Sequence, residues 1–186
     1  MAAKTLLSFL FCLVATGLLA QIRTPAPSPV STVTQAIGLA KVTIEYSRPS
    51  AKGRKIFGEL VPYGKIWRTG ANKITTIQFD SDVTVNGKKI AAGTYGWYTL
   101  PGEKEWTIAL NSDNKQWGAY AYDEKKDVLR LAVKPEKLAQ KAEHFTIEFD
   151  NFTPKAADVV LRWENTAVRF RIEHDPHEQI LAAIKT

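Results

Sequence analysis

Apolar residues recur at every second position along most of the chain after residue 40. The alternation is clearest in four segments, 42–46, 145–149, 159–163 and 168–172. Each segment has one face suited to a core and one suited to solvent, which is typical of antiparallel sheets. With the shorter apolar runs, the chain contains about ten such segments. The pattern predicts an all-β fold built as an antiparallel sandwich, jelly-roll-like in its spacing, with a closed barrel as the alternative.

Turn residues lie between the predicted strands. Asn86-Gly87 predicts a two-residue type I′ hairpin, because both residues tolerate a positive φ. Pro101-Gly102 predicts a second hairpin, and Glu164-Asn165-Thr166 a third. Near the C-terminus, Asp175 and Pro176 have the order of an N-cap and a first helical residue. One short C-terminal helix is therefore expected, with its apolar stripe packed on the sandwich.

The first 20 residues are typical of a secretory signal peptide. Lys4 precedes an apolar run from Leu6 to Ala20, which ends in a small residue before a polar one. The run is too short to favour a membrane anchor. Cleavage after Ala20 leaves residues 21–36, rich in Pro, Ser and Thr, as an extended tether, and residues 37–186 as a single sandwich domain. We therefore expect a secreted or periplasmic protein with no membrane span after cleavage.

Removal of the signal peptide also removes Cys12, the one cysteine of the chain. The mature protein then has no disulfide, no thiol nucleophile and no thiolate metal site. Its 24 Lys and Arg face 19 Asp and Glu, a mild basic excess that is weak evidence for nucleic acid, so no nucleic-acid partner is expected. The chain also lacks the glycine-rich motifs of nucleotide binding, and no cofactor is expected.

Residues 48–73 interrupt the alternation and carry seven basic residues against one acidic residue, with four glycines and two prolines. A long connection of this kind in a compact domain is commonly functional. In one interpretation it forms a ligand cleft: Arg68 would bind an anion, Trp67 would stack on a sugar ring and Asn72 would hydrogen-bond. In the other, Trp67 and Phe57 cover one end of the sandwich, while Arg68 and Asn72 satisfy loop carbonyls. An arginine in a glycine-rich loop often caps carbonyls, which favours the second interpretation.

Aromatic residues are frequent, with five tryptophans and six tyrosines in the chain. Tyr95 and Trp97 share one face of a predicted strand, and Tyr98 lies on the other. If both faces of this strand carry aromatic rings, a loop or the helix must cover the second face, or one face binds a ligand. Amphipathic rings of this kind suit stacking against sugars. Trp97 therefore joins the candidate ligand contacts, as does Lys73, the basic residue that ends the 48–73 segment.

Metal binding and catalysis find little support in the sequence. His174 and His177 have the H-x-x-H spacing of a metal pair, but they straddle the predicted helix start and have no evident third ligand. We interpret them as surface histidines and expect no metal site. Asp113, Asp123 and Asp127 flank an aromatic stretch, where two carboxylates facing a sugar would suit glycoside hydrolysis. Because they also fit solvated turns, no catalytic residue is assigned and the sequence leans away from an enzyme.

Several short motifs identify a family. Ser47-Arg48-Pro49, Ile56-Phe57-Gly58, Trp67-Arg68-Thr69-Gly70-Ala71-Asn72 and Gln116-Trp117-Gly118-Ala119-Tyr120 together resemble DUF2911, a bacterial family of domains of unknown function. The resemblance runs from about Ser47 to about Ile172, and its most specific part is the string from Trp67 to Asn72. It implies exported proteins with a β-rich fold and no assigned activity. It carries over no catalytic residue.

These observations lead to one functional hypothesis and two alternatives. The leading hypothesis is a non-enzymatic exported domain that binds a carbohydrate or an anionic component of the cell envelope through residues 48–73. Its predicted ligand contacts are Trp67, Arg68, Asn72, Lys73 and Trp97. The alternatives are a hydrolase of envelope glycans that uses a carboxylate pair, and a structural or assembly module.

Overall fold

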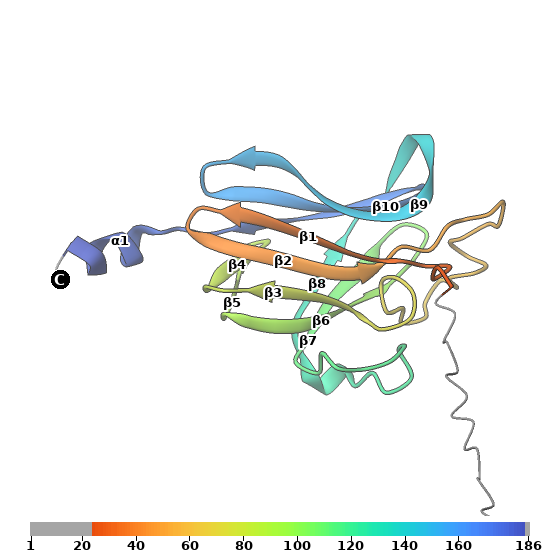
Figure 1. Cartoon of the computed structure of the whole chain (residues 1–186), viewed down its shortest axis with the longest axis horizontal. Helices are drawn as coiled ribbons and strands as arrows, with labels where there is room; N and C mark the ends of the chain where they lie inside the picture. Colours follow the sequence, from red (N-terminus) through yellow and green to blue (C-terminus); the bar gives the residue numbers. More distant parts are fainter. Residues whose placement is uncertain (1–23, 185–186) are drawn as a thin grey trace, which may run out of the picture.

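The computed structural model describes residues 24–184 and places two antiparallel sheets face to face (Figure 1). In spatial order, the larger sheet consists of β1 (Val30–Ile37), β2 (Ala40–Ser47), β3 (Thr75–Phe79), β6 (Gly93–Leu100), β7 (Trp106–Asn111) and β8 (Asp127–Val133). The smaller sheet consists of β5 (Lys88–Ile90), β4 (Val83–Val85), β10 (Ala156–Glu173) and β9 (Glu136–Thr153). The predicted all-β antiparallel sandwich is confirmed.

The core lies between the two sheets and follows the predicted alternation. Val42 and Ile44 on β2 and Ile77 on β3 are fully buried on the inner face of the larger sheet. Val159 and Leu161 on β10 are fully buried from the opposite sheet. Full burial of each such side chain contributes about 1.5–3 kcal/mol, so the period-two pattern supplies most of the force that holds the sheets together.

Two of the three predicted hairpins are confirmed. Asn86 and Gly87 have φ values of 43° and 81° and join β4 to β5, with Val85 paired to Lys88. Pro101-Gly102 lies in the connection between β6 and β7, which pair in register from Leu100↔Thr107 onward. Local turn chemistry was sufficient to place both.

The predicted hairpin at Glu164-Asn165-Thr166 is wrong, because β10 continues through these residues. The pairing partner changes from Thr146 for Arg162 to Ala142 for Glu164, so the register shifts here, with extra residues on β9 and no reversal of β10. Glu164 has a φ of 54°, and its carboxylate accepts a hydrogen bond of 3.0 Å from the amide of Ile56. The polar triplet ties the strand to the 48–73 segment instead of reversing the chain.

The predicted tether is also shorter than expected. The signal-peptide prediction for residues 1–20 lies outside the described residues, as do residues 21–23. Residues 30–36, assigned to the tether from their composition, instead belong to β1, which pairs with β2 from Val30↔Ser47 to Ile37↔Ala40. An alternation of Val, Thr and Ile in this segment suits a strand, and the three prolines all precede it.

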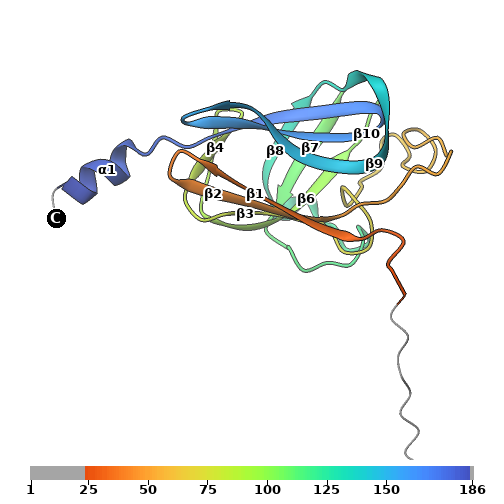
Figure 2. The same ribbon diagram turned by 45° about the horizontal axis from the view of Figure 1, so that its top comes forward.

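The predicted C-terminal helix is present as α1 (His177–Ile184), and Asp175 accepts a hydrogen bond of 3.2 Å from the amide of His177. The expected packing on the sandwich is wrong: α1 extends beyond the end of the sheets (Figures 1 and 2), and Ile180 and Ile184 are 46% and 73% exposed. Within residues 24–184, no helix has the length and apolarity needed to cross a membrane.

Phe145 and Phe152 on β9 provide a matched test of the core. Phe145 is fully buried among aromatic rings, with its centroid 5.3 Å from that of Trp67, whereas Phe152 is 56% exposed. We expect Phe145→Ala to lower the free energy of unfolding by about 3–5 kcal/mol, because it leaves a cavity. Phe152→Ala should change it by less than about 0.5 kcal/mol. Denaturant titration measures both, and equal losses would contradict this description of the core.

Candidate functional site

Residues 48–73 close one end of the sandwich with an aromatic cluster. The ring of Trp67 stacks on Trp163 at 5.9 Å, and Phe57 packs edge-on against Trp106 at 4.7 Å. Trp67 is 8% exposed, and its indole N–H donates to the carbonyl of Gly70 at 2.9 Å. Trp67 therefore covers one end of the sandwich, as the second interpretation of this segment predicted. Its burial does not fit the prediction that its ring contacts a ligand.

Trp97 also lies in the core. It is fully buried, and its ring packs edge-on against Phe170 on the opposite sheet at 5.2 Å. No face of the ring reaches the surface, so the prediction of Trp97 as a ligand contact is corrected. The neighbouring Tyr98 is buried on the other side of the same strand, which means that β6 is covered on both faces.

Arg68 makes no hydrogen bond to a loop carbonyl through Nε, and its predicted role as an anion contact stays a prediction. Its side chain is half-buried, and Nε is buried with no hydrogen-bond partner among the described residues. The carbonyl-capping role belongs to two other arginines of the segment. Arg54 donates to the carbonyls of Ala51 and Ser50 at 2.9 and 2.7 Å, and Arg48 donates to the carbonyl of Phe145 at 3.3 Å.

Asn72 and Lys73 are the two predicted contacts that line a surface cavity, of about 220 Å³. Asn72 has a φ of 59° and donates from its amide to the carbonyl of Ser28 at 3.2 Å, so it also satisfies a backbone carbonyl. The side chain of Lys73 is exposed. The remaining lining residues are Val30, Glu45, Tyr46, Ser47, Ile74 and Trp117. We call this cavity the Trp117 pocket.

Trp117 was not among the predicted contacts, yet it is the exposed aromatic of this pocket, with 63% of its surface accessible. Two backbone hydrogen bonds flank it: the amide of Gly118 donates to Asn72, and the amide of Ile74 donates to Gln116, each at 3.3 Å. Gly118 has a φ of 77°, which favours glycine after the tryptophan. The string Gln116-Trp117-Gly118 was the sequence signal for this arrangement.

The loop that carries Trp117, residues 112–126, covers the outer face of β6. Tyr98 packs there against Tyr122 with ring centroids 4.9 Å apart. The hydroxyl of Tyr122 donates to Asp127 at 2.5 Å, and Arg130 donates to the same carboxylate oxygen at 2.8 Å. Burial, followed by the hydrogen bond to Asp127, raises the pKa of Tyr122. This buried polar cluster anchors the loop to β8.

The three carboxylates that were candidates in the hydrolase alternative all accept hydrogen bonds that hold this loop in place. Asp113 accepts hydrogen bonds from Gln116 at 2.8 Å and Lys126 at 3.0 Å, and these contacts lower the pKa of its carboxyl. Asp123 caps the short 3₁₀ turn η1 (Glu124–Lys126). Asp127 is held by Tyr122 and Arg130, so each of the three groups already has hydrogen-bond partners in or next to this loop.

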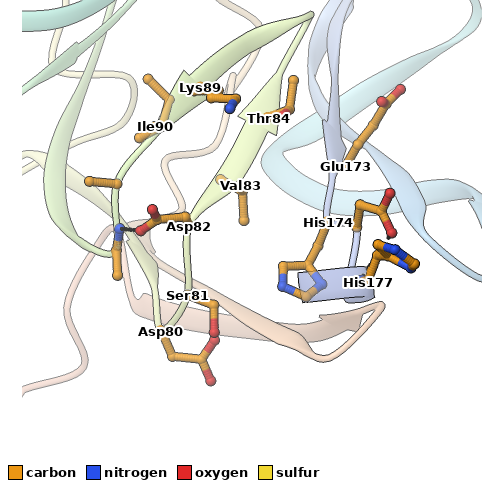
Figure 3. Close-up of a pocket in the computed structure, with 13 residues that line it drawn as sticks. Asp80, Ser81, Asp82, Val83, Thr84, Lys89, Ile90, Glu173, His174 and His177 are labelled. Atoms are coloured by element: carbon orange, nitrogen blue, oxygen red, sulfur yellow. Dashed lines mark hydrogen bonds between the residues drawn. The ribbon is translucent and has the colours of Figure 1, made fainter. Parts of the chain in front are cut away.

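A second, larger cavity of about 830 Å³ lies beside the β4–β5 hairpin and the end of β10 (Figure 3). Asp80, Asp82, Lys89, His174 and His177 are among its lining residues. His174 is only 4% exposed, so its interpretation as a surface histidine is wrong. Among the side chains that the structure describes, which leave out Glu178, no group of three His, Cys, Asp or Glu is arranged to hold a metal ion.

A family model described as "Protein of unknown function (DUF2911)" matches residues 28–172. The match covers well over half of the chain and includes every residue that lines the Trp117 pocket. It ends shortly before His174. No curated protein and no solved structure matches the chain.

Substitution of Arg68 and Arg54 by methionine tests the hydrogen-bond assignment. Arg68→Met should change the free energy of unfolding by less than about 0.5 kcal/mol or raise it slightly, because it removes a buried donor without a partner. Arg54→Met keeps a similar apolar stem but loses two bonds to carbonyls, and should cost about 1 kcal/mol. Denaturant titration of both variants checks the order, and a larger loss for Arg68→Met would refute it.

The buried phenol of Tyr98 makes stability fall in alkali. Burial, and then the negative charges of Asp113 and Asp127, raise the pKa of Tyr98 from 10.0 to about 12. The folded protein therefore keeps this proton at pH values where the unfolded chain releases it, so stability is complete below pH 10 and declines as the pH rises from 10 to about 12. Tyr98→Phe should show a shallower decline across this range in pH-dependent denaturation. Identical slopes would contradict the burial of this phenol.

Proposed function

The chain belongs to the DUF2911 family of proteins of unknown function, and from the geometry of the Trp117 pocket we propose that it is a carbohydrate-binding domain without catalytic activity. The observation that carries the proposal is the exposed indole of Trp117, held at the edge of a cavity that also contains charged and polar groups. An amphipathic ring at a half-wet surface suits stacking against the apolar face of a sugar.

The polar groups around the indole suit sugar hydroxyls and charged substituents. Lys73 and Glu45 line the pocket and make no ion pair within residues 24–184, so the ammonium and the carboxylate are free to contact a ligand. Ser47 adds a hydroxyl, and Ile74 contributes an apolar wall. A cavity that combines one aromatic surface, one apolar wall and a few convergent polar groups is typical of small-molecule recognition.

The proposed ligand is a glycan of the cell envelope. The predicted signal peptide would deliver the mature domain to the compartment where such glycans occur. Lys73 is the group that would contact an acidic substituent of the glycan. The domain would act by holding the glycan and not by cleaving it, because the carboxylates that flank Trp117 in sequence are used to anchor its loop.

Tryptophan fluorescence tests this proposal directly. The other four tryptophans are at most 8% exposed, so Trp117 dominates quenching by acrylamide. We expect soluble peptidoglycan fragments or chitohexaose to protect Trp117 from quenching in a saturable manner. Trp117→Ala should weaken binding by at least about tenfold, because the stacking surface is lost.

Tyr120→Ala is the matched control, because Tyr120 is 92% exposed on the same loop and does not line the pocket. It should leave the affinity within about twofold of the original. Isothermal titration calorimetry measures both variants. Glycan binding that survives Trp117→Ala unchanged would refute the proposed site, and the absence of binding to either glycan would refute the proposed ligand.

A further inference from the structure

The cavity of about 830 Å³ is a second candidate site, separate from the Trp117 pocket. The two lie at opposite ends of β3: Ile74, immediately before the strand, lines the Trp117 pocket, and Asp80, immediately after it, lines the larger cavity. Its size falls within the about 300–1,000 Å³ of small-molecule sites. We call it the His174 cleft, after the most deeply buried of its polar side chains.

The position and tautomer of His174 are held by backbone groups. Its amide donates to the carbonyl of Lys155 at 2.8 Å, and its Nδ1 accepts a hydrogen bond of 3.3 Å from the amide of Leu39. A Cβ at Gly38, where φ is 59°, would lie 2.8 Å from Nδ1, so this packing requires a glycine. Because Nδ1 uses its lone pair to accept, the ring proton is on Nε2.

Nε2 of His174 is therefore a hydrogen-bond donor, on a residue that lines the cleft. The ring is 4% exposed, and Figure 3 shows it directed from the end of β10 toward the segment of Ser81 and Asp82. The His174 cleft thus contains one donor group whose position is fixed by hydrogen bonds to the backbone.

Two carboxylates on the other side of the cleft supply acceptors. Asp80 uses Oδ1 to accept from the amide of Lys41 at 2.6 Å, and Asp82 uses Oδ1 to accept from the amide of Ala92 at 2.8 Å. Each carboxylate is thereby oriented by a backbone amide at the edge of the cleft. Val83, the first residue of β4, adds an apolar side chain to the lining.

The charged side chains that line the cleft disfavour the binding of an anion. Glu173 and Asp175 also line it, but Glu173 pairs with Arg171 at 3.3 Å and Asp175 with Lys155 at 2.9 Å. Asp80 and Asp82 have no ion pair within residues 24–184, and Lys89 is the one Lys or Arg in the lining. The unpaired charge facing a ligand is thus negative, and a negatively charged ligand would be repelled.

We propose that the His174 cleft binds a small polyhydroxylated molecule, a sugar of one or two rings that carries no negative charge. One ligand hydroxyl accepts from Nε2 of His174, and neighbouring hydroxyls donate to the carboxylates of Asp80 and Asp82. An ammonium group on the sugar adds attraction to the same carboxylates. This site does not depend on the Trp117 pocket, so either one can fail without the other.

Nuclear magnetic resonance tests the proposal with three sugars of similar shape and different charge. Glucose, glucosamine and glucuronate are each titrated to about 100 mM into the ¹⁵N-labelled protein, far above a millimolar dissociation constant. We expect glucose and glucosamine to shift the amide signals of Leu39, Asp82 and Ala92 in a saturable manner. Glucuronate should bind at least about fivefold more weakly than glucosamine.

Two variants separate ligand binding from folding. His174→Asn keeps an acceptor for the Leu39 amide at the position of Nδ1 but removes the Nε2 donor, and Asp82→Asn keeps the bond to Ala92 but removes the charge. Each should weaken glucosamine binding about tenfold while the rest of the spectrum is preserved. Trp117→Ala is the control for the other pocket and should leave the cleft signals unchanged.

Three results would overturn the proposal. The first is no movement of the three amides with glucose or glucosamine up to about 100 mM. The second is glucuronate binding as tight as that of glucosamine, which would show that the carboxylates do not face the ligand. The third is unchanged affinity in Asp82→Asn, a variant that leaves the His174 packing intact and so does not depend on whether His174→Asn folds.

Discussion

Strand β6 is buried on both faces, and the arrangement of the Trp117 pocket depends on this constraint. Trp97 packs inward against the smaller sheet, and the adjacent Tyr98 must be covered from outside. The loop of residues 112–126 provides that cover, and its polar groups must in turn be satisfied. Asn111, Tyr122, Asp127 and Arg130 meet this requirement with a hydrogen-bonded cluster. Once anchored, the loop presents Trp117 beside β2 and the residues that precede β3.

The two ends of the sandwich have been closed in different ways. At one end, the 48–73 segment inserts Phe57 and Trp67 among core aromatics, so a sequence rich in glycine and charge still completes the hydrophobic core. At the other end, the β4–β5 hairpin and the end of β10 leave a cavity, and the helix that follows extends away from it. The polar side chains of His174, Asp80 and Asp82 are oriented there by backbone amides.

Many charged side chains of this protein stabilise the fold through hydrogen bonds, including several in the basic segment that was predicted to bind a ligand. Arginines of the basic segment donate to backbone carbonyls, and the carboxylates around Trp117 anchor a loop. A buried or half-buried ionic group must find partners, whereas an exposed one such as Lys73 pays no such penalty and stays free for a ligand. The exposed charged groups without an ion pair among the described residues, such as Lys73 in one cavity and Asp80 and Asp82 in the other, are therefore the informative ones for ligand binding.

The sequence alone determined the features that depend on neighbouring residues. The alternation established the antiparallel sandwich, Asn86-Gly87 established a hairpin, and Asp175-Pro176 marked the start of the helix. The tertiary structure decided whether a polar triplet such as Glu164–Thr166 is a turn or a register shift within a strand, because that depends on the strand opposite. It also decided that Trp97 is buried and Trp117 exposed, since a period-two pattern does not show what covers each face. Both cavities join residues more than 40 positions apart, and only folding brings their hydrogen-bonding groups together.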